Sequence, residues 1–516
     1  MGLAAKLRSW SQELTAYFIY TLLIATLGPL LFGYHLAELN APQEVITCAK
    51  KTITTAAGKS RQPSASLSLS ISGLPQCIPM NTAQIGLVSS MFTLGGLIGA
   101  LAAGPLAARY GRLVAMRANT VLLALGPVAE ALAPNIGVLA AGRWVSGLGA
   151  GVAVVVVPIY ISETAPPREK GFFGAFTQIM TNMGIFTTQL LGYFLSRGQL
   201  WRVILAVAGM VAVAQFVGLL FVVDSPAWQA DHGDPRQARA NLKRIRGPNV
   251  DVNSEVAAWR VQPAAADGTE EEEQQTLLGN SDGSPQRSGD RPTTPAKHDQ
   301  APALGILGVL RSPTQRPAIV AVVMVMLAQQ LCGINSIVMY GVSLLADLLA
   351  SNSALLNILV SILNVVATTG FAPLADVLGR KTVILASIAG MAVSSVLLGL
   401  GIRSSIPVLS AVSVLLFVAS FAFGLGPVPF ILASELVGPE AVGATQSWAL
   451  AANWISTFIV AQFFPVVNER LGKGVVYFVF AALAAAFFLF ISYFVPETKG
   501  KKDADEVWGR PPRRED

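Results

Sequence analysis

Six amide side chains lie inside long apolar runs of this sequence. They are Gln178, Gln329, Gln330, Asn335, Asn364 and Asn453. An amide carries a hydrogen-bond donor and an acceptor in one side chain, and it is costly to place in hydrocarbon. These residue types suit a site for an uncharged solute that is rich in hydroxyl groups. The alternative is that the amides pair between helices for packing, and this alternative weighs most for Asn453.

Two titratable side chains lie in the first apolar run. His35 and Glu38 are three residues apart, so they share one face of a helix. Histidine changes its charge near neutral pH, and an intramembrane carboxyl group commonly relays protons. Glu38 is therefore the stronger candidate for proton coupling, with a water-exposed position at the end of the span as the alternative. Glu130, near the end of the third run, receives no role.

The elements that hold these residues are hydrophobic. Apolar residues make up 53% of the 516-residue chain and charged residues 13%, whereas soluble proteins have about one-quarter charged residues. Twelve runs are long enough to cross a bilayer as helices. They cover 15–37, 83–103, 114–133, 137–160, 173–195, 201–223, 318–347, 354–375, 382–401, 407–433, 444–467 and 474–494. The first run is too long for a cleavable signal peptide.

Lys and Arg concentrate at the termini and in the connections that follow the even-numbered runs. This bias predicts that both termini are cytoplasmic, although the connection after the first run is also basic. The formal net charge of +6 follows from this arrangement at span ends, so we expect no nucleic-acid partner.

The two halves of the chain repeat one another. Gly111 and Arg112 recur as Gly379 and Arg380, each 268 residues later. Glu163 recurs as Glu435, and an acid follows the last run of each half, at 224 and 497. Two similar hydrophobic halves are typical of secondary transporters, whose substrate site lies where the repeats meet.

The runs and the repeat predict five regions. These are a cytoplasmic N-terminus (1–14), an N-terminal bundle of six helices (15–223), a cytoplasmic linker (224–317), a C-terminal bundle of six helices (318–494) and a cytoplasmic tail (495–516). The linker combines a basic segment with an acidic and Ser/Gly/Pro-rich stretch that has too few apolar residues to fold.

Three cysteines occur in the chain. Cys48 and Cys77 both fall in the connection after the first run, on the side opposite the cytoplasm. A disulfide is plausible there in an oxidising compartment, and two free thiols are the alternative. Cys332 lies within the seventh run, where we expect it to be a packing residue.

Six motifs in order resemble one known family. They include G-P-L-L-F-G-Y-H in the first run, G-R-W-V-S-G-L-G-A-G and P-I-Y-I-S-E-T-A-P in the fourth, Q-Q-L-C-G-I-N-S in the seventh, G-P-V-P-F in the tenth and V-P-E-T-K-G after the twelfth. This combination resembles the sugar-porter branch of the major facilitator superfamily. Within that branch the wording F-G-Y-H-x-A-E-L-N is most similar to fungal sugar-transporter-like members, some of them vacuolar.

The resemblance implies an all-α membrane protein with two six-helix bundles and no enzymatic activity. It implies alternating-access transport of a monosaccharide such as a hexose, by uniport or by proton symport. We expect a sugar, protons and membrane lipids as partners, no cofactor or metal, and function as a monomer. A sugar receptor that does not transport, or a carrier of a polyol, is the alternative. The resemblance is compatible with the plasma membrane and with the vacuolar membrane.

The same resemblance assigns roles to individual residues. It places the six amides at sugar-contacting positions, with Phe430 and Trp454 as aromatic walls. His35 stands where proton-coupled members have Asp, close to the position of Arg143. Phe430 stands where many members have Trp, and a phenyl ring can stack on a sugar without donating a hydrogen bond.

The resemblance also predicts a cytoplasmic gate made of charged residues at the ends of both halves. These are Arg109, Arg112, Glu163, Lys170 and Asp224 in the first half, and Asp376, Arg380, Lys381 and Glu435 in the second. The alternative is that the basic residues only fix the topology. Ala108 stands where Asp or Asn is usual in the family, and Ala227 stands where Arg is usual, so we expect a weakened gate and a preference for inward-open states.

Overall fold

The computed structural model describes most of the chain. The described residues are 15–49, 73–166, 169–232, 234–247, 250–253, 255–256, 306–349, 352–371, 377–438, 441–501 and 503–510. Asp376 and the side chain of Lys170 lie outside them, as do the N-terminus and most of the acidic stretch of the linker.

The first half of the chain, here called the N half, contains the first six predicted spans. Its helices are α2 (Ala16–Ala37), α3 (Gln43–Ile46), α4 (Thr82–Tyr110), α5 (Arg112–Ala131), α6 (Ile136–Thr164), α7 (Lys170–Leu195) and α8 (Trp201–Leu219). Two short helices follow, α9 (Pro226–Asp231) and α10 (Pro235–Arg246).

The second half, here called the C half, contains the other six. Its helices are α13 (Ile306–Arg311), α14 (Arg316–Leu331), α15 (Ile334–Leu349), α16 (Asn352–Phe371), α18 (Arg380–Arg403), α19 (Pro407–Ser420), the π-helix η2 (Phe421–Leu425), α20 (Val428–Glu435), α21 (Val442–Leu471), α22 (Val475–Phe494) and α23 (Ala504–Val507).

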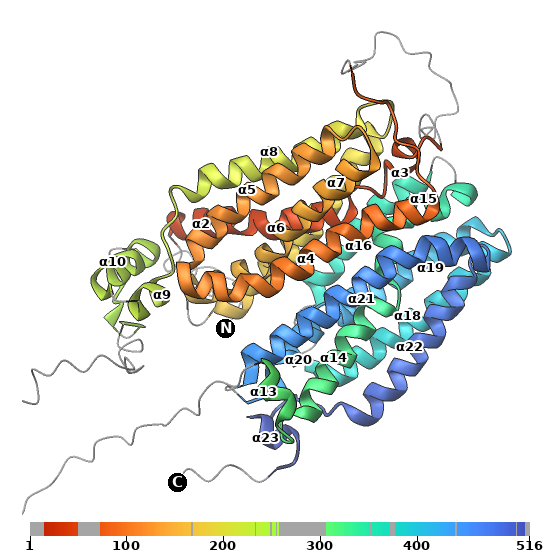
Figure 1. Cartoon of the computed structure of the whole chain (residues 1–516). Coiled ribbons are helices and arrows are strands. Elements are labelled where there is room, and N and C mark those ends of the chain that lie inside the picture. Colours follow the sequence, from red (N-terminus) through yellow and green to blue (C-terminus); the bar gives the residue numbers. More distant parts are fainter. Residues whose placement is uncertain are drawn as a thin grey trace, which may run out of the picture.

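Among the described residues, eleven helical segments are long and apolar enough to cross a membrane. The remaining predicted span coincides with α7, a helix of 26 residues that packs along α2 and α16. Figure 1 shows the N half and the C half as two groups of helices lying side by side. The all-helical fold in two related bundles is thus confirmed.

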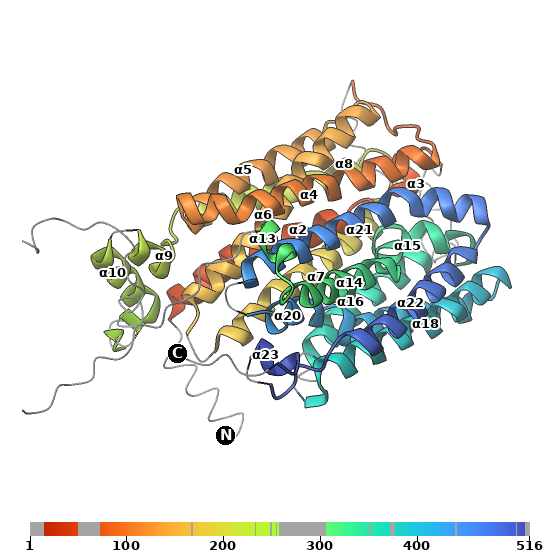
Figure 2. The same cartoon turned by 60° about the horizontal axis from the view of Figure 1, so that its bottom comes forward.

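The molecule has two distinct ends. Figures 1 and 2 both show α9 and α10 at one end and α3 at the opposite end. We call them the linker end and the disulfide end, because Cys48 and Cys77 form a disulfide beside α3 with Sγ atoms 2.17 Å apart. There the Trp201 indole N–H donates to the carbonyl of Gln76 at 2.8 Å, which fixes the segment next to the disulfide on the start of α8.

Close packing inside the N half depends on small residues. A Cβ atom at Gly147 would lie 2.1 Å from the carbonyl oxygen of Phe92, and one at Gly151 equally close to that of Gly96. Helices α4 and α6 therefore touch backbone to backbone, as small residues permit in membrane proteins.

Two spans of the C half are interrupted. Between α14 and α15 the chain turns at Gly333, which has a φ of +103°. The tenth span changes from α19 to the π-helix η2 and then restarts as α20 after Gly426 and Pro427. A residue with positive φ and a proline that lacks an N–H group both stop the regular hydrogen bonding of a helix. Backbone groups freed in this way need partners from side chains.

Candidate functional site

Four of the six predicted amides form one hydrogen-bonded group beside the interrupted spans. The Gln329 amide N–H donates to the carbonyls of Leu425 and Gly426, at 2.9 and 2.8 Å. The Gln329 oxygen accepts from Asn453 at 2.5 Å and from Gln330 at 3.3 Å. We call Gln329, Gln330, Asn335 and Asn453 the amide group. Its Gln329 supplies the donors that the break in the tenth span requires.

Asn335 completes this group from the other side of the Gly333 turn. Its amide N–H donates to the Gln330 oxygen at 2.6 Å and lies 3.5 Å from the hydroxyl of Thr457 on α21. The turn brings two amides of one span, on α14 and α15, into direct contact. Discontinuous helices of this kind form the substrate sites of many secondary transporters.

The other two predicted amides belong to a second chain of hydrogen bonds, which crosses between the halves. Gln178 on α7 donates to Asn182 at 3.3 Å, and Asn182 donates to the hydroxyl of Thr368 at 3.1 Å. Thr368 in turn donates to Asn364 on α16 at 3.1 Å. The sequence analysis did not select Asn182 or Thr368. A polar side chain one helical turn from Gln178 and from Asn364 was the available signal.

The two predicted aromatic residues have different surroundings. Trp454 is 4% exposed and contacts the rings of Phe32 and Phe92 in the N half, with centroids 5.7 and 6.2 Å away. A Cβ atom at Gly96 would lie 2.2 Å from the indole of Trp454, so the indole packs flush against α4. Phe430 on α20 is 39% exposed, so its ring is not enclosed by other side chains as the indole of Trp454 is.

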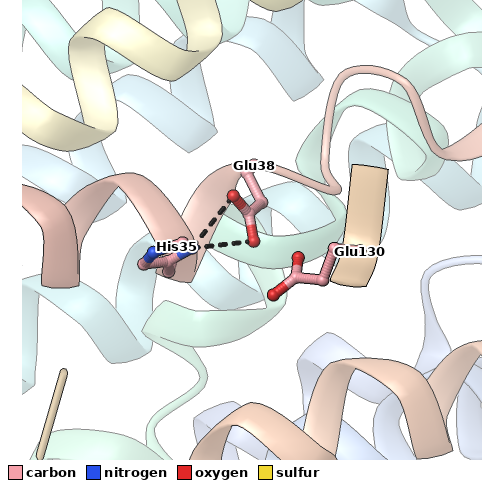
Figure 3. A group of neighbouring side chains, drawn as sticks. All are labelled: His35, Glu38 and Glu130. Atoms are coloured by element: carbon pink, nitrogen blue, oxygen red, sulfur yellow. Dashed lines mark hydrogen bonds and ion pairs between the residues drawn. The ribbon is translucent and has the colours of Figure 1, made fainter. Parts of the chain in front are cut away.

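A second cluster, made of charged side chains, lies inside the N half. His35, Glu38, Glu130 and Arg143 are each at most 1% exposed. Arg143 forms an ion pair with Glu38, and its Nη1 also donates to the carbonyl of His35 at 2.7 Å. The Nδ1 atom of His35 lies 3.0 Å from both carboxylate oxygens of Glu38. Figure 3 shows His35 and Glu38 together, with the carboxyl group of Glu130 facing that of Glu38.

Glu130 enters the cluster from α5. Its Oε1 accepts from the hydroxyl of Ser146 at 2.6 Å, while its Oε2 has no hydrogen-bond partner among the described residues. One ligand-type atom from each of His35, Glu38 and Glu130 lies within 4.8 Å of the others. The guanidinium of Arg143 already neutralises Glu38, so a divalent ion would leave this buried cluster with excess positive charge. We therefore assign no metal to it.

The predicted gate residues repeat in both halves at the linker end. Arg112 pairs with Glu163 at 2.6 Å in the N half, and Arg380 pairs with Glu435 at 3.0 Å in the C half. Each ion pair lies within one half. Lys381 donates instead to the carbonyl of Ser492 at 2.8 Å.

Two further gate residues of the N half differ in their contacts. Arg109 is exposed, with its guanidinium 5.3 Å from the ring of Tyr110. Asp224 accepts from the backbone N–H groups of Leu113, at 3.0 Å, and Ser225, at 2.7 Å. Burial raises the pKa of Asp224 above its usual range.

Toward the disulfide end, the halves are joined directly. The Asn40 amide donates to the carbonyl of Val338 at 2.9 Å and to the Asn357 oxygen at 3.3 Å, and the Val342 N–H donates to the Asn40 oxygen at 2.9 Å. Ser90 donates to Gln462 at 2.8 Å. The two ion pairs at the linker end, Arg112–Glu163 and Arg380–Glu435, each join helices of a single half. The hydrogen bonds of Asn40 and Ser90 thus join the halves toward the disulfide end, whereas these two ion pairs at the linker end stay within their own halves.

Known proteins of the same kind are recognisable over almost the whole chain. Residues 21–507 match the family described as sugar (and other) transporter. The chain is 32% identical to the probable metabolite transport protein YBR241C of Saccharomyces cerevisiae, over 97% of each chain. It is 30% identical to vacuolar protein sorting-associated protein 73 of the same yeast, over 95% of this chain and 96% of that one.

The fold has a solved counterpart. The inward-open conformation of the xylose transporter XylE from E. coli superposes with a TM-score of 0.72 at 24% identity, over 96% of this chain and 99% of that one. Coverage of this extent leaves only short segments outside the shared architecture. The chain therefore belongs to the sugar (and other) transporter family, and it is a multi-pass membrane transporter with the major facilitator fold.

Proposed function

We propose that this protein carries a monosaccharide, a hexose, across its membrane by alternating access. The amide group at the interrupted helices is the observation that carries the proposal. Gln329, Gln330, Asn335 and Asn453 offer several donors and acceptors without net charge, and Trp454 directly follows Asn453 on α21. Hydroxyl groups along one edge of a sugar ring need donors and acceptors of this kind, and an apolar face of the ring can stack on an aromatic side chain.

Alternating access is supported by the distribution of contacts. Asn40 joins the halves toward the disulfide end, and the ion pairs Arg112–Glu163 and Arg380–Glu435 stay within their own halves at the linker end. A rocking motion that exchanges these two arrangements would expose a site between the halves to each side in turn.

The orientation follows from the same charges. We place the linker end and both termini in the cytoplasm, because Lys and Arg concentrate there. The disulfide end then faces an oxidising space, which suits Cys48 and Cys77. The vacuolar membrane and the plasma membrane both fit this orientation. The yeast relative named for vacuolar protein sorting favours the vacuole as the first membrane to examine.

The test is transport by the purified protein in liposomes. We expect saturable uptake of radiolabelled glucose, followed with and without an inward proton gradient. Gln329→Ala should abolish uptake, because it removes the donor to Leu425 and Gly426 and the acceptor for Asn453. Gln237→Ala is the matched control, since this amide is exposed on α10 outside the spans.

Competition by unlabelled sugars and polyols then defines the substrate. Inhibition by other hexoses and none by inositol would support a hexose carrier. Stronger inhibition by a polyol would replace the hexose with that class. Folded protein, shown by a cooperative melting transition in detergent, that moves no monosaccharide or polyol would contradict the proposal and favour a receptor.

A further inference from the structure

We propose that Glu130 on α5 is the residue that binds the transported proton, and that Glu38 serves as the permanent charge partner of Arg143. This inference rests on the proposed transport function, to which it adds proton symport with one proton for each sugar. The sequence analysis considered Glu38 and His35 for coupling and gave Glu130 no role.

The argument begins with the number of charges inside the N half. Glu38 and Glu130 each carry one negative charge when ionised, and Arg143 carries one positive charge. His35 is fully buried, and its Nδ1 faces Glu38 while its Nε2 has no partner among the described residues. A neutral imidazole and one added proton on a carboxylate make the cluster electrically neutral. A cluster without that proton would hold one uncompensated charge away from water, which is strongly unfavourable.

The hydrogen bonds show which carboxylate takes the proton. Glu38 accepts from Arg143 and lies within hydrogen-bond distance of His35, so its negative charge is well stabilised. Glu130 accepts only from the neutral hydroxyl of Ser146 in the described structure, and its other oxygen is unpartnered. Two neighbouring carboxylates that cannot both ionise share one proton, which goes to the less stabilised one. That residue is Glu130, whose free oxygen would carry the O–H bond.

One other charged side chain packs near Glu130. Arg202 on α8 is buried, and its Nη1 donates to the carbonyls of Ala131 and Ala133 at 2.7 and 2.9 Å. Its Nη2 donates to the carbonyl of Pro75 at 2.9 Å. The guanidinium of Arg202 thus donates to backbone carbonyls at the end of α5 and in the segment beside the disulfide. Among the described residues, it forms no ion pair with Glu130. The Tyr34 O–H group donates to the carbonyl of Ile204, so its hydrogen is directed to that carbonyl rather than to Glu130.

The cluster is connected to the moving parts in two ways. Glu38 lies two residues before Asn40, whose amide joins α2 to α15 and α16 toward the disulfide end. Arg143 stacks on the ring of Phe92 at 4.7 Å, and Phe92 contacts Trp454, the neighbour of Asn453 in the amide group. A change of charge at Glu130 therefore acts on residues that touch both the contact between the halves and the sugar site.

The proton step is simple in chemical terms. A proton from water on the disulfide side forms the O–H bond on Glu130 when that side is open. The neutral cluster and the bound sugar then pass through the closed state together. The O–H bond breaks once water reaches the cluster from the linker side, and the proton passes to that water. No electron transfer or co-reactant is involved.

The test measures sugar and protons in the same vesicles. Liposomes that contain the protein and a pH-sensitive dye inside receive sugar from outside, and acidification is recorded beside sugar uptake. We expect about one proton for each sugar in the unmodified protein. In Glu130→Gln we expect acidification to fall to the rate of protein-free vesicles, while exchange of labelled for unlabelled sugar continues within a few-fold of the unmodified rate. Glu130→Asp should restore part of the acidification.

Glu469→Gln is the matched control, because Glu469 is an exposed carboxylate near the C-terminal end of α21. It should leave both signals unchanged. Sugar uptake without proton movement, sugar uptake driven by Na⁺, or proton movement that survives in Glu130→Gln would each overturn the inference while leaving sugar transport intact.

A separate measurement applies if no sugar is transported. Infrared difference spectra between acidic and alkaline buffer should contain the carbonyl band of a buried carboxylic acid, and this band should disappear in Glu130→Gln. Its persistence in that variant would overturn the assignment. Its loss would retain Glu130 as the proton site of a carrier for another solute.

Discussion

At the linker end, the Arg112–Glu163 pair of the N half has its counterpart in the Arg380–Glu435 pair of the C half. In both halves a carboxylate also accepts a hydrogen bond from the first turn of the helix that follows a positive-φ glycine. Asp224 accepts from the N–H group of Leu113 on α5, and Glu497 accepts from that of Arg380 on α18. The interiors of the two halves are quite different. The N half contains the buried charges of Glu38, Glu130 and Arg143. The C-half positions that match Glu130 and Arg143 at the same offsets, 398–402 and 411–415, hold no charged residue.

The C half differs in its backbone as well. Helix α6 runs unbroken from Ile136 to Thr164, while its counterpart is divided into α19, η2 and α20. That division frees the carbonyls to which Gln329 donates. The like arrangements at the linker end suit a task that both halves perform, which is opening and closing the linker side of the transporter. The unlike interiors suit the division of labour proposed above, in which the C half supplies most of the sugar contacts and the N half compensates charge.

The largest expected effect comes from removing the buried cation of the N half. Arg143→Gln leaves Glu38 without its ion-pair partner in a site that excludes water. Loss of one member of a buried pair costs about 3–5 kcal/mol of stability. We expect a large drop in the melting temperature of the detergent-solubilised protein.

The control is the double variant Glu38→Gln with Arg143→Gln. It removes both charges, so it should recover much of the stability that the single change loses. A double variant that is as unstable as Arg143→Gln alone would mean that packing of Arg143 on Phe92 matters more than charge.

The second effect concerns the amides of the C half. Gln329→Leu leaves the carbonyls of Leu425 and Gly426 without their donor and removes an acceptor from Asn453. An unsatisfied buried polar group costs about 1–3 kcal/mol, and the same penalty in the sugar-bound state lowers sugar affinity by about fivefold to 150-fold. Equilibrium binding of labelled sugar measures it. An unchanged dissociation constant would move the sugar site away from the amide group.

Much of this architecture could be predicted from the sequence because it depends on composition and spacing. The apolar runs predicted the spans, and the recurrence of Gly111–Arg112 as Gly379–Arg380 predicted the two related halves. The amides were selected because polar residues are rare in such runs. Their grouping also follows a local rule, since Gln329 and Gln330 are neighbours and Asn335 lies just beyond the Gly333 turn.

The remaining features depend on how separate helices are rotated against one another. Glu38 and Glu130 are far apart in the chain, and only the packing of α2 and α5 against α6 brings them to the same place. Apolar content likewise gave the seventh and tenth spans as continuous runs, because hydropathy does not record a break. Gly333 and Pro427 were the local signals for the interruptions. Asn182 and Thr368 became visible as links only across the contact between α7 and α16.

The third prediction uses the likeness of the linker ends. Gly111 and Gly379 have φ values of +93° and +101°, and a Cβ atom at either would lie 2.5 Å from a carboxylate oxygen, that of Asp224 or Glu497. With ψ values of 155° and 146°, both glycines lie in a backbone region that other residues rarely adopt, and a side chain there costs about 1–3 kcal/mol. Gly111→Ala and Gly379→Ala should therefore lower the melting temperature by similar amounts. A clear difference between them would show that the two ends are not equivalent.

The smallest effect is a pH dependence at Asp224 in the N half. Burial raises the pKa of Asp224 in the folded protein, so the folded state holds the proton of this carboxyl more tightly than the unfolded state does. The stability that Asp224 contributes is therefore fully present in acid, below the ordinary pKa of an aspartic acid, and it declines as the pH rises through the raised value. Asp224→Asn cannot titrate, so the stability of the unmodified protein relative to this variant should increase as the pH falls. Melting curves of the two proteins across the acidic range measure the difference. An increase in their relative stability toward neutral pH would mean that the backbone N–H groups of Leu113 and Ser225 outweigh burial at this carboxylate.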